Sequence, residues 1–286
     1  MKKRASVIGL YNRKGGAGKT TSCINIGASL AYMGYHVLLI DSDSQHNLTN
    51  FFFATDRSVM EYGSVKPDVP TIVEVLSKEA DIAEVVRTVT YHFKRKENNR
   101  MVQKSLSLDV IMSSQTISDM APEENDDKHE IYKLIDPLRE KYDYILIDFP
   151  PEMGLLPITF MFACDYILSP VELSNSDGRL GYLQVLNIVL SFKETGPYPC
   201  PDALGMFYTK GAPYKKWQKD MLEEDLKNQV LRAFNTMIRD DITAVSKASS
   251  YAMQPLCVCE PRSKSAIDYM KLTEELINRI NDRQNQ

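Results

Sequence analysis

The sequence predicts an α/β fold built on a mostly parallel, twisted sheet that is flanked by helices. Three observations predict it. Short apolar runs alternate with amphipathic helical patterns along nearly the whole chain, a glycine-rich stretch follows the first apolar run, and acidic residues directly follow two later runs. Parallel strands of such a sheet bring their carboxyl ends to one edge, so we expect the residues that follow these runs to share one site.

Hydrophobic periodicity indicates where the individual elements lie. Short apolar runs predict buried strands, and longer stretches with apolar residues three and four positions apart predict helices. The strands are expected at residues 7–11, 36–40, 108–112, 144–147, 166–170, 203–208 and 230–237. The helices are expected at residues 21–33, 71–76, 128–141, 178–192, 214–228 and 263–281.

The domain organisation is expected to be simple. The chain has 286 residues, of which 43% are hydrophobic and 25% are charged, a composition typical of a globular domain. We expect one domain over residues 1–286, with surface insertions near 54–70 and 91–105 where the alternation is interrupted. The second insertion is basic, because residues 91–104 contain five Lys or Arg side chains and one Glu, a net charge of +4 in a chain of net charge −4.

Several classes of protein are not indicated. No apolar run approaches the roughly 20 residues that a membrane-spanning helix needs, and the basic N-terminus leads into a short first strand rather than a signal peptide. The five cysteines are scattered and odd in number, which is typical of small buried side chains in a reducing cytoplasm. Cys257 and Cys259 would share a face of an extended segment, but no second Cys or His pair lies near them in sequence to complete a metal site.

Residues 12–22, NRKGGAGKTTS, form a candidate phosphate-binding loop. They follow the first expected strand and open the first expected helix, and they match G-x-x-x-x-G-K-[ST] except that Arg13 takes the place of the first glycine. Glycines let backbone N–H groups turn towards phosphate oxygens, and the helix N-terminus adds its positive dipole. We expect Lys19 to reach the β- and γ-phosphates and the Thr20 hydroxyl to hold Mg²⁺. The other expected contacts in this loop are Lys14, Gly15, Gly16, Ala17, Gly18 and Thr21.

Acidic residues stand at the ends of two further expected strands. Asp41 and Asp43 follow the strand at 36–40, and Asp148 follows the strand at 144–147. A buried acid at a strand end can orient Mg²⁺ or its waters, as the Walker-B acid does. A single such acid is more often a helix cap or a turn former. The prediction therefore depends on all three strand ends carrying the residues that a nucleotide site needs. We expect a P-loop NTPase fold with a magnesium site at Thr20, Asp43 and Asp148.

Together these motifs resemble the deviant Walker motifs of the ParA/MinD superfamily of dimeric ATPases. The similarity continues to the end of the chain and covers essentially all of it apart from the two insertions. The matching segments are residues 14–20 (KGGAGKT), Asp41-x-Asp43-x-Gln45, Asp148-x-Pro150-Pro151, Tyr251-x-x-x-Pro255 and residues 260–269 (EPRSKSAIDY), the last two being similar to S-Y-G-K-P and D-P-x-S-x-G-A-x-x-Y segments of the family.

The resemblance implies a mechanism. In the family two monomers enclose two ATP molecules, so ATP, Mg²⁺ and an ATP-dependent homodimer are implied. Lys14 matches the signature lysine that reaches the phosphates bound by the partner, and a cation there neutralises charge on the transferring phosphoryl group. Asp43 matches the acid that positions the attacking water, and Asp41 matches the acid nearer to the metal and the lysine. The implied catalytic residues are therefore Lys14, Lys19 and Asp43.

The same resemblance points to a switch segment and an adenine pocket. Pro150 and Pro151 fall in the segment that responds to the γ-phosphate. Thr209 and Lys210, together with Ile238 and Arg239, match the segments that hold the base. The family usually has Ile-Pro at the second of these places, and Arg239 replaces that proline.

Segregation of plasmid, chromosomal or mobile-element DNA is the leading functional hypothesis. The resemblance implies that an ATP-bound dimer binds duplex DNA without sequence preference and is released when a ParB-like, centromere-binding partner stimulates slow hydrolysis. Clustered Lys and Arg side chains suffice for phosphate contacts. The helix at 214–228 also fits an ordinary exposed face with acids beside its lysines, and the insertion at 91–104 is a second candidate surface. The expected DNA contacts are Lys215, Lys216, Lys219, Arg262 and Lys264.

Location and the alternative function follow from the two ends of the chain. The phosphate loop begins at residue 12, so we expect no N-terminal DNA-reading domain, and we expect a cytoplasmic, nucleoid-associated protein. A MinD-like, membrane-associated regulator of division-site placement is the alternative, and it calls for a basic amphipathic C-terminal helix. Leu272, Leu276, Ile277 and Ile280 form only a short apolar stripe, which we expect to pack on the domain rather than on a membrane. A metabolic or kinase use of the fold stays open, although the sequence carries no dedicated substrate motif.

Overall fold

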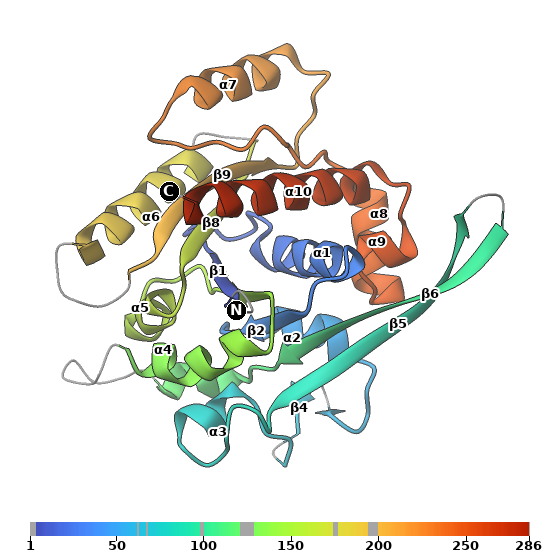
Figure 1. Cartoon of the computed structure of the whole chain (residues 1–286), viewed down its shortest axis with the longest axis vertical. Coiled ribbons are helices and arrows are strands. Elements are labelled where there is room, and N and C mark those ends of the chain that lie inside the picture. The colour runs from blue at the N-terminus through green and yellow to red at the C-terminus, as the bar shows by residue number, and fades with distance from the viewer. Residues whose placement is uncertain are drawn as a thin grey trace.

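A seven-stranded sheet with helices on both faces forms the centre of the molecule (Figure 1). The structure is a computed structural model and describes residues 4–61, 63–66, 68–97, 100–120, 129–173, 177–193 and 200–285. The strand order is β5-β6-β2-β7-β1-β8-β9, and every neighbouring pair is parallel except β5 and β6. The strands are β1 (Ser6–Leu10), β2 (Val37–Asp41), β5 (Val86–Glu97), β6 (Arg100–Ile111), β7 (Tyr144–Asp148), β8 (Tyr166–Glu172) and β9 (Asp202–Thr209), and β3 (Met60–Glu61) pairs with β4 (Ser64–Val65) in a separate small hairpin.

The helices cover the sheet in two layers. Buried side chains of α1, α2, α8, α9 and α10 form one core on one face, and those of α3, α4, α5 and α6 form a second core on the other face. The α-helices are α1 (Lys19–Tyr32), α2 (Asn47–Phe53), α3 (Ile72–Leu76), α4 (Glu130–Ile135), α5 (Leu155–Phe162), α6 (Asp177–Lys193), α7 (Lys216–Lys227), α8 (Ile242–Ser246), α9 (Leu256–Cys259) and α10 (Lys264–Gln284). Short 3₁₀-helices η1 (Gln115–Met120) and η2 (Asp136–Glu140) and a π-helical turn η3 (Lys247–Ala252) join them.

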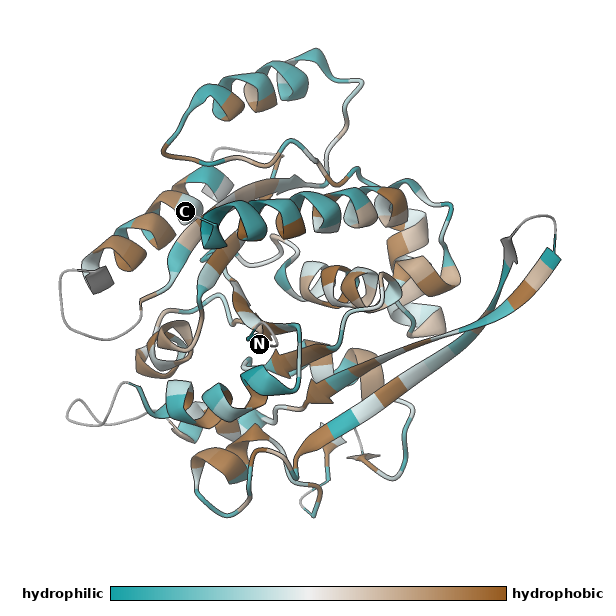
Figure 2. Ribbon diagram, in the orientation of Figure 1, coloured by the Kyte–Doolittle hydropathy of each residue, from teal (hydrophilic) through white to brown (hydrophobic). Residues whose placement is uncertain are grey.

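The central strands are apolar on both sides because both faces of the sheet are covered. Along the first strand Val7 packs in one core, whereas Ile8 and Leu10 pack in the other, and all three are fully buried. Figure 2 shows the strands in the middle of the sheet mainly in brown, whereas α7 is mainly teal. This two-sided burial fixes the carboxyl ends of β1, β2 and β7, which carry the candidate site.

The C-terminal helix α10 packs on α1 rather than standing free. Leu272, Leu276 and Ile280 are fully buried in the core that contains α1. Burying each such side chain contributes about 1.5–3 kcal/mol to stability. The expectation that the apolar stripe packs on the domain is confirmed. Among the described residues, no helix is both long enough and apolar enough to cross a membrane.

Two expected elements differ in the structure. The strand expected at 230–237 is wrong: this segment is irregular, although the N–H groups of Phe234 and Ile238 donate to the carbonyls of Met206 and Tyr208 and so cover the edge of β9. The helix expected at 128–141 begins outside the described residues at 128, and from Glu130 it is α-helical only to Ile135. It then becomes 3₁₀-helical at a proline, which has no backbone N–H for an α-helical hydrogen bond.

The two expected insertions contain β-hairpins, and the cysteine pair lies on a helix. The stretch near 54–70 contains the β3–β4 hairpin, and the stretch at 91–105 forms the distal part of the β5–β6 hairpin. Cys257 and Cys259 lie on helix α9, so the extended segment on which they would share a face is absent there. Cys23, Cys164, Cys257 and Cys259 are free thiols.

Candidate functional site

The glycine-rich loop links β1 to α1 and has the backbone conformation that glycine permits. Gly16 has φ +75° and Gly18 has φ +92°, both in the left-handed region that other residues rarely adopt. A Cβ atom added at Gly15 or Gly16 would meet no other atom within 4 Å, so these two residues border open space. Helix α1 begins after Gly18 without a side-chain cap, which leaves N–H groups of its first turn for an anion.

Lys19 is the buried cation of this loop. Its Nζ donates to the carbonyl oxygen of Asn12 at 3.1 Å and to that of Lys14 at 3.4 Å. Burial lowers the pKa of Lys19, and the carboxylates of Asp148 and Asp43 oppose that shift. Lys19 therefore joins the start of the loop to its end, and the lysine side chain borders the open space in front of the loop.

Asn12 positions the loop and was not singled out from the sequence. Its Oδ1 accepts the Lys14 N–H at 2.9 Å, and its Nδ2 donates to the Pro170 carbonyl at 2.8 Å. A Cβ at Gly181 of α6 would lie 2.4 Å from Asn12 Oδ1, so this close approach requires glycine there. These contacts join residues far apart in sequence, and only the position of Asn12 at the start of the loop could have drawn attention to it.

Asp41 accepts hydrogen bonds that fix the position of α2. The Thr49 backbone N–H and the Thr49 hydroxyl donate to Asp41 Oδ2, at 2.8 Å and 2.7 Å. The Asp43 N–H donates to Asp41 Oδ1 at 3.1 Å. Burial raises the pKa of Asp41 to about 6, although the hydrogen bonds from Thr49 oppose the rise. Both carboxylate oxygens have protein partners, so Asp41 supports α2 and the start of the segment that carries Asp43.

Asp148 is the unpartnered acid of the site. It pairs in register with Asp41 on β2 and with Leu10 on β1, which places it at the carboxyl edge beside the loop. It is fully buried, and neither of its carboxylate oxygens has a hydrogen-bond partner among the described residues. Burial raises the pKa of Asp148 well above its usual range and the neighbouring Asp41 adds to the rise, whereas the nearby Thr20 hydroxyl and the charge of Lys19 oppose it. A buried carboxylate without partners costs free energy, so this position favours a bound cation.

Asp43 lines the open space in front of the loop. Its Oδ1 accepts the N–H of Gln45 at 2.9 Å, and burial raises its pKa while the charge of Lys19 lowers it. The described residues contain no group of three or more His, Cys, Asp or Glu side chains arranged to hold a metal ion. Mg²⁺ characteristically takes one or two carboxylates together with phosphate oxygens and water. Thr20 and Asp43 border the larger cavity, whereas Asp148 is fully buried and is not among its lining residues, so a magnesium site at Thr20, Asp43 and Asp148 stays a prediction.

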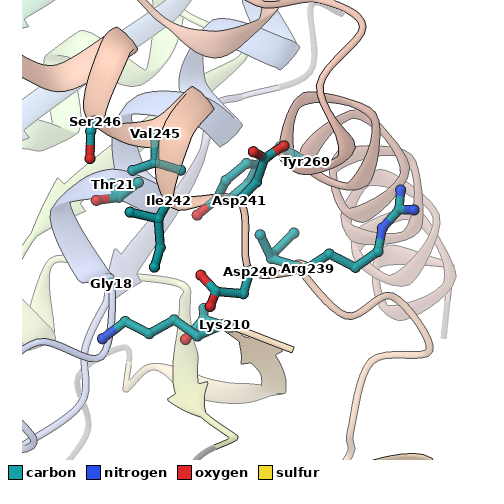
Figure 3. Close-up of a pocket in the computed structure, with 12 residues that line it drawn as sticks. Gly18, Thr21, Lys210, Arg239, Asp240, Asp241, Ile242, Val245, Ser246 and Tyr269 are labelled. Carbon is teal, nitrogen blue, oxygen red and sulfur yellow. The ribbon is translucent and has the colours of Figure 1, made fainter. Parts of the chain in front are cut away.

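Two adjoining cavities extend from the loop. The larger, of about 580 Å³, lies over the glycines and is bordered by Lys19, Asp43 and Pro151. The smaller, of about 350 Å³, is lined by the segment 238–242, Val245 and Tyr269 (Figure 3). Gly18, Thr21 and Lys210 line both cavities. Two compartments that share a wall, the larger with the greater share of polar surface, suit a phosphate chain joined to a planar base.

The predicted base-binding residues meet in the smaller cavity, but they contribute differently. Thr209 donates from its Oγ1 to the Ala17 carbonyl at 3.0 Å, and Ile238 lines the wall. The Arg239 side chain turns towards α10 instead, where Nε and Nη2 each donate to the buried Asp268 at 2.8 Å (Figure 3). Arg239 is nonetheless among the residues that line the smaller cavity, so its contact with the base stays a prediction. Tyr269, the last residue of the motif at 260–269, also lines this cavity, and the other lining residues, which the sequence did not indicate, are Asp240, Asp241, Ile242, Val245 and Ser246.

Lys14 lies beside the loop and pairs within its own chain. Its Nζ is 3.4 Å from Glu172 Oε2, and Lys210 Nζ is 3.4 Å from Glu172 Oε1. Glu172 ends β8, and sequence reasoning missed it because an acid at that strand end matched no motif. Of the two prolines that the resemblance placed in the switch segment, Pro151 borders the larger cavity and Pro150 is buried.

The predicted DNA contacts lie on two elements. Lys215, Lys216 and Lys219 are exposed at the start of α7, where Lys219 pairs with Glu223 at 3.8 Å. Arg262 and Lys264 are exposed where α10 begins, and the Lys264 backbone N–H donates to Asp241 at 3.1 Å. That second group therefore adjoins the smaller cavity.

Comparison with known proteins gives consistent matches. Residues 5–196 match the AAA_31 family, described as an AAA domain. The sporulation initiation inhibitor protein Soj of Bacillus subtilis is 29% identical over 277 residues, which are 94% of this chain and 97% of Soj. The structure of cobyrinic acid a,c-diamide synthase from Mycobacterium smegmatis with bound ADP and magnesium superposes with a TM-score of 0.72 at 20% identity, over 97% of this chain and 96% of that one. A putative plasmid partition protein from Borrelia burgdorferi bound to AMPPNP superposes with a TM-score of 0.71 at 20% identity, over 98% and 100%.

Proposed function

Because the chain belongs to the AAA_31 family of AAA domains and to the ParA/MinD superfamily of ATPases close to Soj and ParA, we propose that it is a partition ATPase. It binds Mg²⁺-ATP and forms a homodimer, and the dimer carries DNA until hydrolysis releases it. The observation that supports this most strongly is the uncapped glycine loop with buried Lys19 beside the unpartnered carboxylate of Asp148.

The residues of the loop supply binding and charge neutralisation. The N–H groups around Gly15 to Gly18 surround the phosphates, and Lys19 neutralises charge between the β- and γ-phosphates. Thr20, Asp43 and Asp148 would hold Mg²⁺, which when bound polarises the phosphate oxygens. The adenine occupies the smaller cavity, between Ile238 and the segment of α8.

Hydrolysis requires a positioned water and a second cation. Asp43 orients the water that attacks the γ-phosphorus, the bond to the β-phosphate oxygen breaks, and the products are ADP and phosphate. Lys14 acts across the dimer on the phosphates of the partner, so it leaves its contact with Glu172 when the dimer forms. This dependence on a second protomer explains why turnover should be slow and open to stimulation by a ParB-like partner.

DNA carriage is proposed from the family and from exposed basic groups. The relatives include a chromosome-partitioning ATPase Soj of Treponema pallidum and a chromosome partitioning protein ParA of Caulobacter vibrioides. Contacts from clustered Lys and Arg to phosphates need no base readout, so binding would be non-specific and nucleoid-wide. The MinD-like alternative is not favoured, because the apolar stripe of α10 that a membrane would require is buried against α1.

Mixing two inactive variants tests the dimeric mechanism. Lys14→Ala should bind ATP normally but hydrolyse it poorly, and Asp43→Ala should also hydrolyse it poorly. In a mixed dimer, one site combines the intact Asp43 of one protomer with the intact Lys14 of the other. An equimolar mixture should therefore regain about a quarter of the wild-type phosphate release, since half of the dimers are mixed and each has one complete site. Sites that act independently would give no recovery, and full activity in either single variant would contradict the proposed roles.

A further inference from the structure

The β5–β6 hairpin extends beyond the sheet as a two-stranded arm (Figure 1). Strand β6 pairs with β2 only from Asp109 to Ile111, but it pairs with β5 from Arg100 to Ile111. At about 3.4 Å per residue, the free part of β6 spans about 30 Å. The arm leaves from the amino-terminal end of β6, so it lies at the edge of the sheet opposite to the glycine loop.

One face of the arm is held against the body of the molecule. Phe93 stacks on Tyr32 of α1 with ring centroids 6.2 Å apart, and the Arg95 guanidinium lies 4.9 Å from the centroid of the same Tyr32 ring. The Tyr91 hydroxyl donates to the Met253 carbonyl at 3.4 Å. Met253 borders the larger cavity, so the anchored face connects the arm to the nucleotide site.

The opposite face is polar and exposed. Thr88, Thr90, His92 and Lys94 alternate along β5 with the half-buried residues of the anchored face. Cross-strand hydrogen bonds order this surface: Thr90 Oγ1 lies 2.8 Å from Ser107 Oγ, and other such contacts continue towards the sheet. Lys94 shares this face with the hydroxyls, whereas Lys104 and Arg100 pair with Phe93 and Glu97 and so lie on the other face of the ribbon. Hydroxyl and basic side chains on a fixed ribbon are chemically suited to phosphate oxygens.

The charge of the arm contrasts with that of α7. Residues 86–111 contain six Lys or Arg and two acidic residues, a net charge of +4, whereas residues 216–227 contain three Lys and four acidic residues, a net charge of −1. The Asp109 carboxylate of the arm is also engaged, by the hydroxyls of Thr88 at 2.6 Å and Tyr142 at 2.7 Å. The arm is therefore the more strongly basic of these two surfaces.

We propose that the β5–β6 arm is a contact surface for the phosphate backbone of duplex DNA. This inference rests on the proposed function and gives the second candidate surface, residues 91–104, a defined form apart from the predicted lysines of α7 and α10. The major groove of B-DNA, about 12 Å wide, admits a two-stranded ribbon, whereas that of A-form RNA is too deep and narrow. The exposed hydroxyls and the Lys and Arg side chains then contact phosphates on either side.

Two other occupants of this surface fit less well. A membrane interface favours exposed aromatic side chains, but Tyr91 and Phe93 are on the anchored face, and the exposed apolar residues of the described arm are Met101 and Val102. Addition of a further strand from another protein is opposed by Lys94 and Arg95 along the outer strand, since charged side chains protect a sheet edge from pairing.

A charge-matched pair of double variants tests the arm. In the Asp43→Ala protein with Mg²⁺-ATP, binding to a fluorescein-labelled random-sequence duplex is measured by anisotropy across a salt series. Lys94→Gln with Arg100→Gln removes two charges from the arm, and Lys141→Gln with Lys271→Gln removes two exposed charges elsewhere. The arm variant should bind about tenfold more weakly, with the slope of log K against log salt reduced by up to about 1.8. The control should stay within about twofold of the parent.

Each outcome decides the assignment. If the parent binds DNA and the arm variant matches the control, the arm inference is wrong while the proposed function stands. If the parent binds no DNA with ATP present, both fail. Vesicles of phosphatidylglycerol and phosphatidylcholine serve as the second probe, and arm-dependent binding to vesicles without binding to DNA would assign the surface to a membrane instead.

Discussion

The nucleotide edge of the sheet and the β5–β6 arm use charge in opposite ways. At the nucleotide edge Lys19, Asp41 and Asp148 are buried, and their positions are fixed by neighbouring strands and by the loop. On the arm Lys94 and Arg100 are exposed on a ribbon that extends from the body. Buried charges are little screened by salt and act as a unit, whereas exposed charges are screened and contribute in small, nearly additive steps. Substitutions at the two places should therefore differ in size and in salt dependence.

The largest expected effect is that of Lys19→Ala. Removing the buried ammonium takes away charge-assisted hydrogen bonds to the β- and γ-phosphates, so ATP affinity should fall about 100-fold. Titration calorimetry of wild type and variant checks this, with the exposed Lys271→Ala as the control. The loss should be nearly the same at low and high salt, and a loss that disappears at high salt would remove the contrast between the two regions.

Asp43→Ala should affect the chemical step more than binding. A positioned acid or base contributes about 10²–10⁴ to a rate, so ATP hydrolysis should fall at least about 100-fold, while the loss of one of the proposed Mg²⁺ ligands should lower ATP affinity by a smaller factor. Single-turnover hydrolysis and equilibrium ATP binding measured on the same preparation separate the two. An unchanged turnover would show that Asp43 does not orient the water.

Asp148→Asn should stabilise the ligand-free protein by about 1–2 kcal/mol, because it replaces an unpartnered buried carboxyl by a neutral group. Burial raises the pKa of Asp148, so the wild type loses stability as pH rises through that raised value. The gain should therefore be small at pH 4 and larger at pH 8. Urea unfolding at both values measures it, and Mg²⁺-dependent ATP affinity should decline in the same variant. A variant less stable than wild type at pH 8 would contradict the view that Asp148 is held ready for a cation.

The smallest expected effect is that of Tyr91→Phe, which tests whether the two regions communicate. The hydrogen bond from Tyr91 to Met253 joins the arm to the wall of the larger cavity. A single neutral hydrogen bond contributes about 0.5–1.5 kcal/mol, so the factor by which ATP strengthens DNA binding should fall about two- to fivefold, with ATP affinity unchanged. DNA anisotropy with and without ATP measures that factor. An unchanged factor would mean that the arm is independent of the nucleotide.

The comparison also separates what the sequence could predict from what it could not. The glycine loop, Lys19 and Asp148 lie at strand ends, and a local pattern with a fixed position in a parallel sheet is enough to place them. The contacts of Asn12, Glu172 and Asp268 join residues more than 20 positions apart, so no local pattern contains them. Residues 230–237 have the composition of a strand but form an irregular segment along the edge of β9. Their position in the fold therefore overrides their intrinsic strand propensity.

The sequence of the arm contains a strand pattern that its basic residues obscured. Residues 88–93, TVTYHF, alternate polar and apolar side chains with a period of two, which is typical of a half-buried strand. The basic residues that follow obscured this alternation and led to the prediction of a surface insertion without a defined conformation. The structure continues the strand through those residues to Glu97.

The most direct test of the account is ATP-dependent DNA binding by the hydrolysis-deficient Asp43→Ala protein. Anisotropy of a random-sequence duplex is measured with Mg²⁺-ATP, with Mg²⁺-ADP and without nucleotide, from low to high salt. The account predicts tight binding with ATP alone, and an affinity that falls steeply as salt rises. Equal binding in all three states, or no binding in any of them while ATP binding is intact, would contradict it.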